Sequence, residues 1–241
     1  MVPLDTAGVR GYLVHAYTAS TLLFVSLAMQ WIVEERYQLA LLAMAATVII
    51  DATDGALARH YRVTETAAGI QGDLLDNIVD FLSYVALPAL FLLHADMLLA
   101  PATLWVSLVM FASAFGFSRT DAKIAGKGFF VGFPSYWNIV VFYLWMLGTG
   151  PLFNTALILV LASAVLVPLR FLYVTRLSRW RTLHFLLGGL WGLACLLALL
   201  LGEGQLQDLL LYASLGYVAF YLVHSLIEDA RDRAHSAGKV K

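Results

Sequence analysis

Apolar runs long enough to cross a lipid bilayer recur along this chain, and they limit its possible folds more than any other feature. The hydrocarbon core of a bilayer is about 30 Å thick and needs about 20 mostly apolar helical residues to cross it. Of the 241 residues, 61% are hydrophobic and 13% are charged, and the mean hydropathy is +0.81. This composition excludes a soluble globular domain and predicts an all-α, polytopic integral membrane protein.

The apolar runs predict about eight transmembrane helices joined by short connections, which leave no room for a separate soluble domain. The predicted spans cover about residues 12–33, 38–58, 74–95, 99–118, 134–149, 153–175, 182–202 and 206–227. We therefore expect residues 1–241 to form a single membrane domain. The polar C-terminal tail, residues 228–241, is expected to fray beyond the last helix.

The basic residues indicate how the chain is oriented in the membrane. All of the 15 Lys and Arg residues except Arg36 lie before the first predicted span or at and after the cytoplasmic ends of spans two, four, six and eight. Cytoplasmic loops of membrane proteins carry an excess of Lys and Arg. Both termini and the loops at 59–73 and 119–133 are therefore predicted to lie in the cytoplasm, which also requires an even number of spans.

Five carboxylates lie at the cytoplasmic ends of spans two and three, in the stretch "IIDATDGALARHYRVTETAAGIQGDLLDNIVDFLSY". They are Asp51, Asp54, Asp73, Asp76 and Asp80. On α-helices, Asp51 and Asp54 share one face, and Asp76 and Asp80 share another. A single Asp at a helix end is usually a cap or a solvated charge. Several carboxylates at the edge of membrane helices instead predict a functional site.

Carboxylates that lie close together repel one another, and cations allow them to stay ionised. A set of oxygen ligands without His or Cys favours a hard cation such as Mg²⁺, Mn²⁺ or Ca²⁺. Mg²⁺ and Mn²⁺ in such sites commonly bind substrate phosphates as well. The six histidines are scattered without metal-ligand spacing, and we assign them no role.

Small residues accompany the carboxylates. Gly55 follows Asp54 directly, Ala58 lies nearby, and Gly72 precedes Asp76 by four residues. Glycine at such positions allows another group to approach the backbone closely, and Arg59 can contact a phosphate. Taken singly, the small residues also fit close helix packing, and Arg59 also fits a cytoplasmic anchor.

Together these residues resemble the signature of the CDP-alcohol phosphotransferases, integral membrane enzymes of phospholipid synthesis. The first half of that signature, D-x2-D-G-x2-A-R, is matched by residues 51–59, and the second half, G-x3-D-x3-D, by residues 72–80. The spacer at 60–71 is longer than is usual in the family. A register through Gly69 and Asp73 would restore the usual spacer, but it requires an aspartate at Asn77, so we reject it.

The longer spacer is similar to that of bacterial phosphatidylcholine synthases, as are the stretches "LLDNIVDFLSYV", "SRTDAK" and "GFPSYWNIVVFYLW". The resemblance implies that Asp51, Asp54 and Asp76 bind divalent metal, and that Asp80 also faces the metal and is the catalytic general base. It implies two Mn²⁺ or Mg²⁺ ions that hold the CDP diphosphate. The alcohol hydroxyl would attack the phosphatidyl phosphorus of CDP-diacylglycerol, and CMP would leave.

The substrate contacts that we expect fall into two groups. The residues expected to bind CDP-diacylglycerol are Gly55, Ala58, Arg59, Gly72, Asp73, Arg119 and Lys123. Choline carries a fixed positive charge without N–H donors, and aromatic faces and carboxylates recognise such cations. The residues expected to bind choline are Tyr84, Asp121, Tyr136 and Trp137. Aromatic residues at the start of a span also occur as interfacial belts.

The expected partners are CDP-diacylglycerol, choline, membrane lipid and a second copy of the chain, without nucleic acid. The expected location is the bacterial cytoplasmic (inner) membrane, with the active site facing the cytoplasm.

A related enzyme could use another acceptor, such as serine, inositol, glycerol phosphate or an inositol phosphate, although an anionic acceptor would require additional basic residues. A cation- or proton-coupled transporter also fits several spans with carboxylates, but leaves the spacing of the glycines unexplained. A non-catalytic scaffold leaves the acidic cluster without a purpose.

Overall fold

The computed structural model describes residues 6–119, 123–124, 128–174, 177 and 180–238. Packing divides the chain into two compact units. Unit 1 contains Met1–Met97 and Trp137–Val141, and unit 2 contains Leu98–Tyr136 and Phe142–Lys241. This division reflects packing alone, and the assignment of residues 1–241 to one functional domain stays a prediction.

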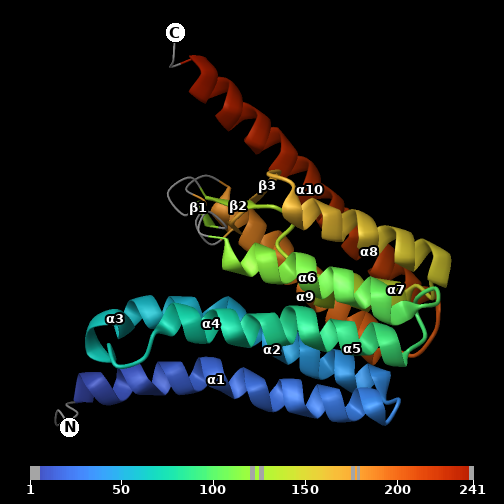
Figure 1. Cartoon of the computed structure of the whole chain (residues 1–241), viewed down its shortest axis with the longest axis horizontal. Helices are drawn as coiled ribbons and strands as arrows, with labels where there is room; N and C mark the ends of the chain where they lie inside the picture. The colour runs from blue at the N-terminus through green and yellow to red at the C-terminus, as the bar shows by residue number, and fades with distance from the viewer. Residues whose placement is uncertain (1–5, 120–122, 125–127, 175–176, 178–179, 239–241) are drawn as a thin grey trace. The chain divides into compact units, whose positions relative to one another are not determined.

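Unit 1 is built around a long first helix. Helix α1 (Thr6–Val33) packs against α2 (Tyr37–His60), the short α3 (Val63–Thr66), α4 (Gly72–Phe81) and α5 (Leu87–His94). A single π-helical turn, η1 (Leu82–Ala86), joins α4 to α5, so that the three segments form one continuous helical stretch (Figure 1). The buried residues of α1 recur every three or four positions, which gives the helix a continuous buried face.

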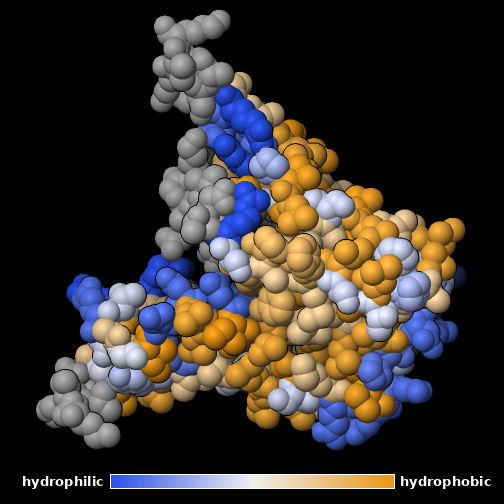
Figure 2. All heavy atoms as spheres, viewed as in Figure 1, coloured by the Kyte–Doolittle hydropathy of each residue, from blue (hydrophilic) through white to orange (hydrophobic). Residues whose placement is uncertain are grey.

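The described basic residues of unit 1 gather mainly at one of its ends, while the orientation of this end in the membrane stays a prediction. The start of α1, the end of α2, α3 and the start of α4 lie at the same end of this unit (Figure 1). Arg10, Arg59 and Arg62 belong to this end, whereas Arg36 lies in the turn between α1 and α2 at the opposite end. Figure 2 shows hydrophilic residues gathered around α3.

Unit 2 contains two helix pairs and a small sheet. Helix α6 (Ala102–Ser118) packs against α8 (Pro151–Leu166), and α9 (Arg181–Leu200) packs against α10 (Gln205–Gly238). Helix α7 (Trp137–Met146) begins in unit 1 and ends in unit 2. The strands β1 (Lys123–Ile124), β2 (Phe129–Val131) and β3 (Arg170–Leu172) form an antiparallel sheet in that order, with Phe130 opposite Phe171.

The structure confirms an all-α, multi-pass membrane protein in its main features. Within the described residues, five helices are long and apolar enough to cross a bilayer: Thr6–Val33, Tyr37–His60, Gly72–His94, Arg181–Leu200 and Gln205–Ala234. Large apolar side chains also point away from the protein, for example Leu13 (63% exposed) and Leu186 (64% exposed). Hydrophobic residues cover much of the face shown in Figure 2. Such surface is costly in water and favourable in lipid.

The predicted count of eight spans is not confirmed. The predicted spans 99–118, 134–149 and 153–175 correspond to α6, α7 and α8, which have 17, 10 and 16 residues. A helix rises 1.5 Å per residue, so α7 is only about 15 Å long, roughly half of a hydrocarbon core. The number of membrane crossings and the cytoplasmic location of both termini therefore stay predictions.

Two sequence predictions in unit 2 are wrong. The span at 153–175 ends early, because α8 stops at Leu166, Val167 is extended, and the following Pro168 has no N–H for a helix. The tail beyond residue 227 does not fray at once, because α10 continues to Gly238. The ion pairs of this extension include those from Arg170 to Asp232 (2.6 Å) and from Arg233 to Asp229 (2.9 Å).

Candidate active site

Three of the predicted carboxylates come together in unit 1. One oxygen from each of Asp51, Asp76 and Asp80 lies within 4.8 Å of the others. Asp51 comes from α2, and the other two come from one face of α4, because four residues make about one helical turn. This spacing allows all three oxygens to contact one hard cation, whose bonds to oxygen are about 2.0–2.6 Å long. The arrangement therefore has the donor chemistry of a Mg²⁺ or Mn²⁺ site.

Tyr84 holds Asp51 in this arrangement. Its hydroxyl donates a hydrogen bond of 2.6 Å to Oδ2 of Asp51. Tyr84 is buried within the π-helical turn η1, and such turns occur frequently at functional sites. From the sequence, Tyr84 was predicted to bind choline, whereas in the structure its hydroxyl is bonded to the carboxylate cluster. The contact between its ring and choline stays a prediction.

Asp54, the fourth predicted metal ligand, is hydrogen-bonded to helix α1. Its side chain is buried, with 6% of its surface exposed, and its Oδ2 accepts a hydrogen bond of 2.9 Å from the Thr18 hydroxyl. The hydroxyls of Tyr17 and Thr53 are 2.8 Å apart and make a second polar contact between the same two helices. These contacts position the end of α2 that carries the carboxylates. The predicted metal contact of Asp54 stays a prediction.

The two signature glycines each lie under a polar side chain. A Cβ added to Gly55 would lie 3.4 Å from Nη1 of Arg59, so the guanidinium folds back over this glycine. A Cβ added to Gly72 would lie 3.1 Å from Cε1 of His15, which is closer than ordinary contact. Gly72 therefore leaves room for the imidazole of α1 at the first residue of α4.

Ala58 and Asp73 have structural surroundings of their own. Ala58 packs with Leu57 and Tyr61 against a small apolar cluster of Val14, Val63 and Ala67. Asp73 is exposed in the first turn of α4, where a negative charge is favourable beside the helix N-terminus. Contacts of either residue with CDP-diacylglycerol stay predictions.

The remaining predicted residues are distributed along the chain as follows. Trp137 belongs to unit 1 and is fully buried, whereas Tyr136 belongs to unit 2 and lies edge-on to Phe133. Arg119 directly follows α6, and Lys123 begins β1, both in unit 2. Asp121 lies outside the described residues. The roles predicted for this set stay predictions.

Two polar residues of α1 near the motif, Thr18 and His15, were not predicted from the sequence. Both side chains are buried. In the sequence, His15 and Thr18 stand out only as two polar residues three positions apart in a mainly apolar helix. The Nε2 atom of His15 has no hydrogen-bond partner within the described part of the chain. A buried polar atom without a partner is rare in native proteins and requires an explanation.

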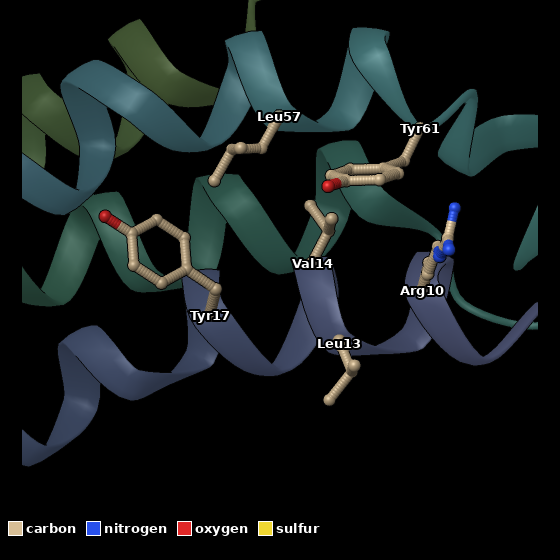
Figure 3. A pocket seen from close by; sticks show the side chains of 6 residues that line it. All are labelled: Arg10, Leu13, Val14, Tyr17, Leu57 and Tyr61. Atoms are coloured by element: carbon tan, nitrogen blue, oxygen red, sulfur yellow. The ribbon is translucent and has the colours of Figure 1, made fainter. Parts of the chain in front are cut away.

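A pocket of about 230 Å³ lies between α1 and the end of α2. Its lining consists of Arg10, Leu13, Val14, Tyr17, Leu57 and Tyr61. Figure 3 shows Val14 and Tyr17 rising from α1 toward Leu57 and Tyr61 on the other side. The pocket therefore combines aliphatic walls with a guanidinium and two phenols at the basic end of unit 1.

Comparison with known proteins identifies relatives that cover most of this chain. A phosphatidylcholine synthase of Legionella pneumophila is 38% identical over 220 residues, which cover 88% of this chain and 85% of the relative. A phosphatidylcholine synthase of Pseudomonas aeruginosa is 33% identical and covers 79% of each chain. That of Bradyrhizobium diazoefficiens is 35% identical over 82% of this chain and 74% of its own length.

No family model matches the chain. The long matches to these relatives and the complete signature across residues 51–80 nevertheless agree with each other. The chain therefore belongs to the CDP-alcohol phosphotransferases, in the family of bacterial phosphatidylcholine synthases.

Proposed function

We propose that this chain transfers the phosphatidyl group of CDP-diacylglycerol to choline and releases CMP, at a divalent-metal site on the cytoplasmic face of the inner membrane. The observation that carries the proposal is the group of three carboxylate oxygens from Asp51, Asp76 and Asp80, which lie within 4.8 Å of one another. These residues belong to the family signature. The relatives named phosphatidylcholine synthase, which cover most of the chain, support choline as the acceptor.

Asp51, Asp76 and Asp80 would hold Mg²⁺ or Mn²⁺, and Asp54 would complete a site for two ions. Bound ions would supply positive charge that neutralises the diphosphate. Tyr84 fixes the orientation of Asp51 through its hydrogen bond, and Thr18 does the same for Asp54. Arg59, whose guanidinium lies over Gly55, would add a further positive charge for a phosphate oxygen.

Asp80 would act as the general base. Its carboxylate would accept the hydroxyl proton of choline, while the choline oxygen forms a bond to the phosphatidyl phosphorus. The bond from this phosphorus to the oxygen of CMP breaks, and CMP leaves with the bonding electron pair. The protein contributes mainly by positioning the reactants and by arranging charge around the phosphorus.

The residues that we propose to bind the two substrates are those predicted from the sequence. CDP-diacylglycerol would be bound by Gly55, Ala58, Arg59, Gly72, Asp73, Arg119 and Lys123, and choline by Tyr84, Asp121, Tyr136 and Trp137. The basic end of unit 1 would lie in the cytoplasm, where CMP is released, and the active form would be a homodimer. The exposed apolar side chains of the long helices support a location in the membrane.

Purified protein with CDP-diacylglycerol and Mn²⁺, supplied with a panel of alcohols, tests the acceptor. We expect CMP release with choline and little with serine, inositol or glycerol phosphate. Asp80→Asn should lose several orders of magnitude in turnover, whereas the control Asp208→Asn, at an exposed carboxylate of α10, should retain activity. Release with serine or inositol but not choline would establish a different acceptor, and no release with any alcohol would favour a transporter.

A further inference from the structure

His15 is a buried histidine that the proposed chemistry does not use. Its side chain is 6% exposed, and its Nε2 has no hydrogen-bond partner within the described residues. Removing an imidazole nitrogen from water without a new partner is unfavourable. A protein retains such a group where a ligand or an ordered water completes its hydrogen bonding.

The surroundings of His15 place it beside both halves of the aspartate motif. Its Cε1 and Nδ1 atoms lie 3.1 Å and 3.8 Å from the position that a Cβ of Gly72 would occupy. Gly72 is the first residue of α4, which carries Asp76 and Asp80. Three residues along α1, Thr18 donates its hydrogen bond to Asp54. The imidazole therefore lies next to the start of α4 and one turn from the α1 contact with the other half of the motif.

We propose that Nε2 of His15 forms a hydrogen bond with the cytidine portion of CDP-diacylglycerol. The proposal rests on the proposed function and adds a nucleotide-binding residue that lies outside the signature. Gly72, against which the imidazole packs, precedes Asp80 by eight residues, which is about 12 Å of helix rise. The reacting phosphorus has to lie near Asp80, so a group beside Gly72 is placed to meet the far end of the leaving nucleotide.

The chemistry of the other reactants favours the nucleotide as the partner. Choline has one hydroxyl, which must face Asp80, and its trimethylammonium group has no hydrogen-bond donor or acceptor. The acyl chains of the lipid are apolar and belong in the hydrocarbon region. Cytidine has several donors and acceptors on its ribose and its base, and either ring nitrogen of a neutral imidazole can donate or accept.

The direct test measures the binding of CMP to purified protein in the presence of Mn²⁺ by isothermal titration calorimetry. We expect His15→Leu to weaken CMP binding by about tenfold, as for the loss of one buried hydrogen bond. The KM for CDP-diacylglycerol should rise by a similar factor, whereas the KM for choline stays within about twofold. His15→Gln, which keeps both a donor and an acceptor, should recover part of the affinity.

Thermal unfolding separates ligand binding from a purely structural role. Because the nitrogen has no partner within the described protein, His15→Leu should leave the melting temperature unchanged or raise it. The matched control is His184→Leu in unit 2, at a buried histidine whose Nε2 is bonded to His224 at 2.9 Å. His184→Leu should lower the melting temperature of the protein and leave its affinity for CMP unchanged.

Three outcomes would overturn the proposal. Unchanged CMP affinity in His15→Leu shows that the histidine does not contact the nucleotide, while choline transfer by the same variant leaves the proposed function intact. Reduced melting temperature without loss of CMP affinity assigns His15 to packing alone. Wild-type protein that neither binds CMP nor transfers choline would contradict both the proposed function and this inference.

A comparison of two ligands locates the contact on the nucleotide. If His15→Leu loses affinity for CMP but not for ribose 5-phosphate, the contact is with the base, and an equal loss for both ligands supports a contact with the ribose.

Discussion

The Tyr84 hydroxyl donates a hydrogen bond of 2.6 Å to the carboxylate of Asp51. This bond connects the π-helical turn η1 to helix α2. Hydrogen bonds to ionised groups are stronger than those between neutral groups. Here the bond fixes one oxygen of Asp51 and leaves the carboxylate directed toward Asp76 and Asp80. The π turn and the carboxylate cluster are therefore parts of one arrangement.

Removing this hydroxyl should weaken metal binding. Groups that orient a metal ligand typically contribute a factor of about 10–100 in metal affinity or activity. We expect Tyr84→Phe to raise the Mn²⁺ concentration needed for half-maximal activity by about that factor. Tyr212→Phe, at a tyrosine of α10 that is 65% exposed, serves as the control. An unchanged Mn²⁺ dependence in Tyr84→Phe would show that Asp51 is positioned without this bond.

Thr18 should prove important although it lies outside the signature. Thr18→Val removes the donor to the buried Asp54 carboxylate and keeps nearly the same shape. Hydrogen bonds to charged groups contribute about 1.5–3 kcal/mol, so we expect a lower melting temperature and reduced turnover. Thr18→Ser keeps a hydroxyl and should retain most of both. No loss in Thr18→Val, or a loss in Thr18→Ser as large as that in Thr18→Val, would show that the hydrogen bond to Asp54 is not the cause.

The two signature glycines should differ in their tolerance of alanine. In Gly72→Ala the new methyl lies 3.1 Å from the His15 ring, which is held in the helix interface, and turnover should fall clearly. In Gly55→Ala the nearest atom, at 3.4 Å, is the flexible end of Arg59, and the loss should be smaller. Alanine favours the helix by about 1 kcal/mol, so neither variant should lose much stability.

A double-mutant cycle makes the comparison quantitative. If the contact with the imidazole causes the loss, the effect of Gly72→Ala on turnover and CMP binding should be smaller in the His15→Ala background. Purely additive effects, or a larger loss from Gly55→Ala than from Gly72→Ala, would contradict this explanation.

The orientation of unit 1 can be tested by cysteine labelling in a Cys195→Ser background. Arg62→Cys lies at the basic end and should react with an impermeant thiol reagent only when the cytoplasmic side is accessible. Asp96→Cys lies beyond α5 at the opposite end and should react from outside. Both original side chains are exposed, so a failure to react is not caused by burial. Labelling of position 62 from outside would reverse the orientation and separate the site from cytoplasmic CMP.

Of the four metal ligands predicted from the sequence, three lie together in the structure, and much of their geometry is local. Residues 76 and 80 share a face on any α-helix, and two antiparallel helices that pack on α1 bring Asp51 to the same end of unit 1. Contacts made by His15 and Thr18 depend on how α1 packs against α2 and α4. The spacing of residues within α1 does not show how this helix packs against α2 and α4, so the roles of His15 and Thr18 were not predicted.

The other differences have equally physical causes. Hydropathy measures composition rather than helix length, and apolar residues continue past the end of α8 into the strand β3, so the predicted span 153–175 was too long. The π turn has no distinctive sequence pattern. The charged tail resembled a fraying end, but ion pairs with Arg170 and within α10 extend the helix. Charge pairing between distant segments is a tertiary property.

Choline transfer that depends on the carboxylate cluster can be measured directly. Purified protein should be incubated with CDP-diacylglycerol, deuterated choline and Mn²⁺, and the lipid and nucleotide products should be quantified by mass spectrometry. We expect deuterated phosphatidylcholine and CMP in equal amounts, with both products abolished by chelator, restored by Mn²⁺ and absent in a folded Asp76→Asn variant. Formation of CMP without deuterated lipid, or normal transfer by Asp76→Asn, would contradict it.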